Sequence, residues 1–140
     1  MDESILNSVK RQLGLAEDYV PFDAELIMHI NGVLRILNQL GVGTLGFSIT
    51  DSTSTWSEFI PDAPNLYSEV IPYVAMKVRL VWDPPTIGSV VSALQELVKE
   101  YEWRISIQRE SDALAEKWRS EDSYVDEDDY DDAYDYYFYE

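Results

Sequence analysis

Few residues of this chain are of the types that carry out catalysis. It has one histidine, His29, and no cysteine. A catalytic histidine needs an orienting acid and a nucleophile, and nothing beside His29 in the sequence supplies them. The absence of cysteine excludes disulfides, thiolate chemistry and cysteine-ligated metals. We therefore predict a protein that is not an enzyme and has no catalytic residue.

The remaining candidates for a ligand site are also weak. The acidic run DEDDYDD (126–132) resembles a calcium loop, but it lacks the required glycine and a correctly spaced terminal glutamate. The glycines at 41, 43 and 46 do not form a phosphate-binding loop, because the Lys-Ser/Thr step is missing. We expect no metal and no cofactor, and we rank a small metal-dependent nuclease last among the possible functions.

Charge is distributed unevenly along the chain. The 140 residues carry a net charge of −17. Residues 121–140 contain ten acids and no lysine or arginine, so they hold −10 of this charge and residues 1–120 hold −7. Such a chain is poorly suited to neutralising nucleic-acid phosphates or to binding anionic membranes. With no apolar run of membrane-helix length and no signal-like N-terminus, we expect a soluble protein made in the cytoplasm.

Hydrophobic periodicity predicts an all-α fold, a small bundle of about four helices. Asp23 suits the N-cap of the second helix, and Pro72 marks a kink or the first turn of the third. The last helix would be about 45 Å long, which exceeds the span of a small bundle. We expect a helical domain over residues 1–118 and an extended acidic tail over 119–140. The helices are predicted over residues 5–13, 23–40, 65–82 and 89–118.

The connector between the second and third helices, residues 41–64, loses the helical period. FSIT alternates and could be extended, and TWSEFI has the spacing of a single helical turn. Long irregular loops often carry function, so we predict a second contact surface around Trp56 and Phe59. The alternative is a loop that simply covers the core.

The acidic tail is rich in aromatic residues, which a purely solvating segment does not need. We expect it to be disordered in the free protein and ordered on a partner, with rings as anchors and acids steering it toward a basic surface. The alternative is a tail that stays solvated. The candidate partner-binding residues are Trp118, Tyr124, Tyr130, Tyr134, Tyr136, Tyr137, Phe138 and Tyr139. Arg79 and Arg104 are candidates for structural ion pairs, within or between subunits.

Several segments in combination resemble one family. They are KRQLGL, then HINGVLRILNQLGVG, TSTWSEFI, KVRLVWDPP, and the long helix that carries EWR. Over about residues 4–110, the chain is similar to the head–tail connector proteins of long-tailed double-stranded DNA phages and prophages, also called adaptor, head-completion or DNA-packaging proteins. The resemblance stops before Ser120.

The resemblance implies a non-enzymatic virion protein at the head–tail junction. Such proteins form a homo-oligomeric ring, expected to be twelvefold, that binds the portal and extends the DNA channel. The ring offers a docking surface to the tail, or to a further connector or tail-completion protein. Double-stranded DNA would pass through the lumen without specific binding. The alternative is an acidic DNA mimic that inhibits a DNA-binding protein, which would need its acids spread over a folded surface.

Overall fold

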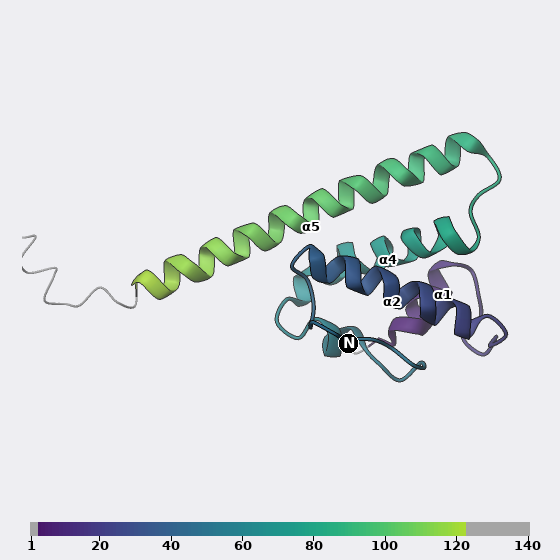
Figure 1. Ribbon diagram of the computed structural model, residues 1–140, viewed down its shortest axis with the longest axis horizontal. Coiled ribbons are helices and arrows are strands. Elements are labelled where there is room, and N and C mark those ends of the chain that lie inside the picture. The colour runs from purple at the N-terminus through teal and green to yellow at the C-terminus, as the bar shows by residue number, and fades with distance from the viewer. Residues whose placement is uncertain (1–2, 123–140) are drawn as a thin grey trace, which may run out of the picture. The chain divides into compact units, whose positions relative to one another are not determined.

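The structure is a computed structural model that describes residues 3–122. It is all-α, as predicted, and the described residues form no strand beyond an isolated bridge between Ser4 and Thr55. Its helices are drawn in Figure 1. In chain order they are α1 (Ile5–Gln12), α2 (Asp23–Gln39), α3 (Trp56–Phe59), the 3-10 helix η1 (Pro64–Leu66), α4 (Tyr67–Trp82) and α5 (Gly88–Asp122).

The contacts divide the chain into two units, Met1–Ile107 and Gln108–Glu140. The first unit contains α1 to α4 and the first part of α5. In the second unit the described residues are the remainder of α5. α5 continues to Asp122, so the helix ends four residues after residue 118; the division into a helical domain and a tail stays a prediction.

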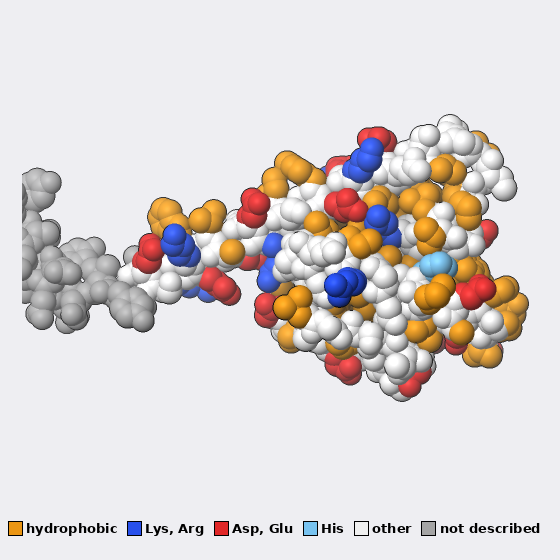
Figure 2. Space-filling model, viewed as in Figure 1, with side chains coloured by type: hydrophobic (Ala, Val, Ile, Leu, Met, Phe, Trp, Pro, Cys, Tyr) orange, Lys and Arg blue, Asp and Glu red, His pale blue; other side chains and the backbone are white. Residues whose placement is uncertain are grey.

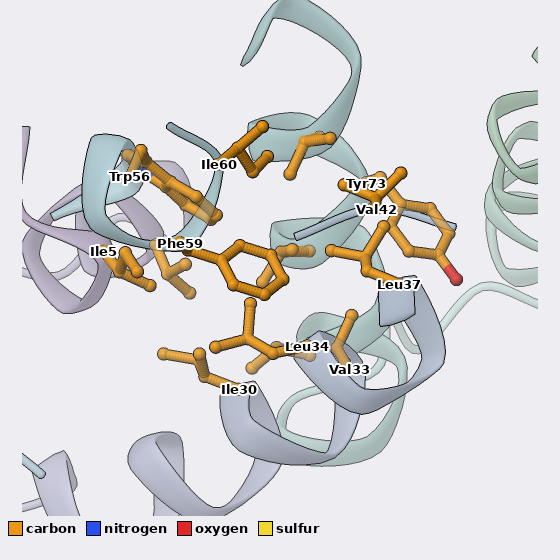
Figure 3. Close-up of a cluster of buried hydrophobic side chains, with 14 of the residues drawn as sticks. Ile5, Ile30, Val33, Leu34, Leu37, Val42, Trp56, Phe59, Ile60 and Tyr73 are labelled. Atoms are coloured by element: carbon orange, nitrogen blue, oxygen red, sulfur yellow. The ribbon is translucent and has the colours of Figure 1, made fainter. Parts of the chain in front are cut away.

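The core of the first unit lies between α1, α2, α4 and the connector. Figure 3 shows residues of α2 facing residues of α3 and the connector, with Ile5 of α1 beside Trp56. The apolar stripe of α2 is buried as its spacing predicted. Its members are Leu26, Ile30, Val33, Leu34 and Leu37.

Helix ends follow from local sequence. At the end of α2, Gly41 has a φ of 88°, a left-handed conformation that glycine adopts at little cost. The N–H of Gly41 donates to the carbonyl of Asn38, and that of Val42 donates to Leu37, which is the Schellman pattern. Val42 and Leu37 are both fully buried, so this turn also directs the chain back onto the core.

The start of α2 differs from the prediction. Asp23 is the first helical residue, and Phe22 takes the cap position without a side-chain hydrogen bond. The reason is tertiary: the Asp23 carboxylate lies 2.9 Å from Nζ of Lys10, which is fully buried in α1. The same ammonium group donates to the carbonyl of Glu17. This ion pair joins α1, the following loop and α2.

The third predicted helix begins with a short 3-10 turn, and α4 proper starts at Tyr67. Pro72 therefore lies inside α4, not in its first turn. Because proline has no N–H, this position cannot make the usual hydrogen bond to the carbonyl one turn earlier.

Candidate functional site

The connector is held against the helices by side-chain amides. Asn31 of α2 acts as a backbone strand would, since its Nδ2 donates to the carbonyl of Ile49 and its Oδ1 accepts from the N–H of Ile49. Two turns further along the same face of α2, Asn38 donates to the carbonyl of Val42. The sequence signal for these two contacts is the spacing of seven between Asn31 and Asn38 in an otherwise apolar helix.

The predicted second contact surface needs correction at its two named residues. Trp56 and Phe59 do form the expected single helical turn, but Trp56 is 1% exposed and Phe59 is 0% exposed. The indole Nε1 of Trp56 donates to Oγ of Ser8 across 2.8 Å in the interior. Both rings therefore close the core, which is the alternative role that we considered for this loop. They are inaccessible to a partner in this fold because α1 and α2 cover them.

The start of α5 packs on α4 through a narrow stripe. Val98 and Ile105 reach the core, and the hydroxyl of buried Tyr73 on α4 donates to the carboxylate of Glu102 across 2.8 Å. Burial raises the pKa of the Tyr73 phenol, and the bond to Glu102 adds to the shift. Lys77 also lies 3.5 Å from Glu102, so its cation balances the carboxylate.

Two adjoining hollows lie between α4, the following Asp-Pro-Pro loop and the start of α5. Their volumes are about 370 and 360 Å³, and both are lined by Arg79, Pro85 and Val90. We call them together the Arg79 groove. Its other lining is mainly apolar and includes Leu13 and Met76.

The two arginines named from the sequence have different surroundings. Arg104 lies 2.7 Å from Glu100 one turn earlier in α5, and both side chains are about half exposed. Arg79 is exposed, and no described side chain forms an ion pair or hydrogen bond with it. Sequence alone did not indicate that Arg79 lines a groove, because the groove forms only when Leu13 from a distant segment and the start of α5 pack beside α4.

The exposed side of α5 carries large apolar side chains in both units. In the first unit Trp103 is 64% exposed, although it lies only two residues from fully buried Ile105. In the second unit Leu114 and Trp118 are exposed and one helical turn apart, so they share a helix face. Figure 2 shows hydrophobic side chains at the surface of this helix. Trp118 is 69% exposed, and its predicted role in binding a partner stays a prediction.

The predicted anchors in the tail lie outside the described residues. This holds for Tyr124, Tyr130, Tyr134, Tyr136, Tyr137, Phe138 and Tyr139. Their role in binding a partner stays a prediction.

Other kinds of site find no support over residues 3–122. No three histidine or acidic side chains in that range gather as they would around a metal ion. None of the helices described is long and apolar enough to cross a membrane. His29, on α2, is partly exposed and has no described hydrogen bond to an acid or a nucleophile.

The described residues thus define an all-α fold whose distinctive surface features are a groove with an unpaired arginine and exposed rings on a long helix. Residues 5–112 match the model of the phage connector protein family. The chain belongs to that family, whose members are structural connectors of phage particles. Comparison with curated proteins and with solved structures finds no match.

Proposed function

We propose that this protein is a subunit of a twelvefold ring between the portal and the tail of a long-tailed DNA phage. The observation that carries the proposal is the match to the phage connector family, which spans nearly the whole described chain. The ring would extend the DNA channel and offer a docking surface to the tail or to a further connector or tail-completion protein. It would catalyse no reaction and need no cofactor.

The exposed surfaces support assembly as the role of this fold. A subunit of a cyclic ring meets its two neighbours through different surfaces, because head-to-tail contacts close the ring. The first unit offers the Arg79 groove and the exposed ring of Trp103, which lie on different parts of its sequence and would suit such unlike contacts. Contiguous exposed apolar side chains are typical of interaction sites.

The charge of the chain is consistent with a DNA conduit. A ring whose subunits each carry a net charge of −17 repels phosphate, so a duplex would pass through it without being held. The acidic tail with Trp118 is the segment that we propose binds the portal or a neighbouring subunit. Its rings would supply buried anchors and its acids would favour approach to a basic surface.

The proposal is tested by the mass of the purified protein in solution, alone and mixed with the portal protein of the same phage. We expect the mixture to contain a complex of fixed stoichiometry with one ring per portal. Deletion of residues 121–140 should abolish portal binding and leave helicity, measured by circular dichroism, unchanged. A protein that ignores the portal but competes with duplex DNA for a DNA-binding protein would overturn the proposal in favour of a DNA mimic.

A further inference from the structure

The Arg79 groove combines an apolar wall with one unpaired cation. Its apolar lining comes from Leu13 after α1, from Pro72 and Met76 on α4, and from Val90 and Leu94 on α5. Arg79 lines both hollows and is the only basic side chain in either. Asp83 lines the second hollow without an ion pair to Arg79. The guanidinium group is therefore available to a ligand.

Other basic side chains of the first unit differ in this respect. Lys10 pairs with Asp23, Lys77 with Glu102, and Lys99 with Glu96. Arg11 contacts both Glu3 and Glu17, and Arg104 pairs with Glu100. Arg35 also lacks a described partner, but it lines none of the described hollows. Among these basic side chains, Arg79 is the one that has no described partner and also lines a described apolar hollow.

A ligand suited to this groove would carry aromatic rings with carboxylates beside them. A tyrosine ring buries a large apolar area, and an arginine guanidinium stacks on its face. A carboxylate beside the ring forms a charge-assisted hydrogen bond with the same guanidinium group. The chain itself contains such a segment: residues 123–140 carry seven aromatic rings, eight acids and no lysine or arginine.

We infer that the Arg79 groove receives the aromatic end of the tail, residues 134–139, from a neighbouring copy of the chain. The inference rests on the proposed ring, in which each subunit gives one surface and receives another. Eleven residues separate Asp122 from Tyr134, and when extended they span at most about 40 Å. A segment of this length allows residues 134–139 to reach a site up to that distance from Asp122. The contact also places negative tail charge beside an unpaired positive charge, which gives a local attraction between two copies of an acidic chain.

The absence of cysteine allows a direct test on the full chain. One protein carries Met76→Cys in the groove, and a second carries Tyr137→Cys in the tail. When the two are mixed under mild oxidation, we expect a mixed disulfide dimer to be the main product. A matched control replaces Met76→Cys by Leu45→Cys, because Leu45 is 82% exposed in the connector and outside the groove.

The expected result is loss of the mixed dimer when Arg79→Ala is added to the groove protein, and no loss when Arg35→Ala is added instead. Equal crosslinking with Met76→Cys and Leu45→Cys, or no mixed dimer at all, would overturn the inference. A tail that fills the groove of its own chain would give no mixed dimer, so it too would overturn the inference. Portal binding is measured on the same Arg79→Ala protein. A ring that assembles on the portal although Met76→Cys and Tyr137→Cys, with Arg79 intact, give no mixed dimer refutes this contact while leaving the proposed function intact.

Discussion

Replacing Gly43 should destabilise the fold through a specific overlap with Phe59. Gly43 has a φ of +83°, and a Cβ built there would occupy the position of the Phe59 ring. The ring has little room to move because Phe59 is fully buried, with Phe47 packed against it at a centroid distance of 5.3 Å. The backbone is also fixed, since the N–H of Thr44 donates to the carbonyl of Phe59 across 2.9 Å.

The loss in free energy of unfolding that we expect for Gly43→Ala has two parts. A left-handed conformation costs a residue with a side chain about 1–2 kcal/mol. Forcing extra volume into a packed core adds about 1–3 kcal/mol. Gly46→Ala is the matched control, because Gly46 has a similar φ of +77° but open space around it. The free energy of unfolding should therefore fall further for Gly43→Ala than for Gly46→Ala, by about 1–3 kcal/mol.

Urea unfolding followed by circular dichroism at 222 nm measures both variants against the parent chain. Phe59→Leu, introduced together with Gly43→Ala, should cost less than the sum of the two single changes, because the smaller side chain relieves the overlap. Equal losses for Gly43→Ala and Gly46→Ala would refute the reasoning. The close approach of Gly43 to Phe59 would then contribute nothing beyond backbone strain.

Three further changes test other parts of the structure. Lys10→Met should lower the free energy of unfolding by about 3 kcal/mol, since it leaves the Asp23 carboxylate without its cation; urea unfolding should show part of the loss restored by adding Asp23→Asn. The free energy of unfolding should fall as pH rises above about 10, because the unfolded chain releases the Tyr73 proton while the raised pKa of Tyr73 keeps it bound in the fold. In Tyr73→Phe the free energy of unfolding should decline less steeply between pH 9 and 11. Trp118→Ser should change the free energy of unfolding by less than about 0.5 kcal/mol, because the ring is exposed, and should weaken portal binding in sedimentation. Unchanged portal binding would contradict a contact role for this ring.

Helical periodicity was sufficient to locate the elements. The stripe from Leu26 to Leu37 predicted α2 and its buried face, and the same reasoning predicted a long last helix that begins near residue 89. The predicted bounds of this helix, 23–40, agree with α2 to within one residue. These features follow from the chain alone, because a one-sided apolar pattern and a left-handed glycine act within a few residues.

Local sequence was less informative about which aromatic residues are accessible. Trp56 and Phe59 lie in an irregular loop of the kind that often carries function, yet the structure buries both. Trp103 stands close to buried Ile105, yet it is exposed because helical rotation places it off the α4-facing stripe. Ring type and loop position do not fix burial; the packing of α1, α2 and α4 around the connector does.

Composition and sequence order by themselves determined that this is an acidic, cysteine-free, helical chain with most of its negative charge in one tail. They also carried the resemblance to phage connectors, because family likeness is a property of the residues in order. Only the tertiary structure decided that Asp23 serves Lys10 instead of capping its helix, and that Arg79 stands unpaired in an apolar groove. Both outcomes depend on side chains brought together from separate segments, which local spacing does not encode.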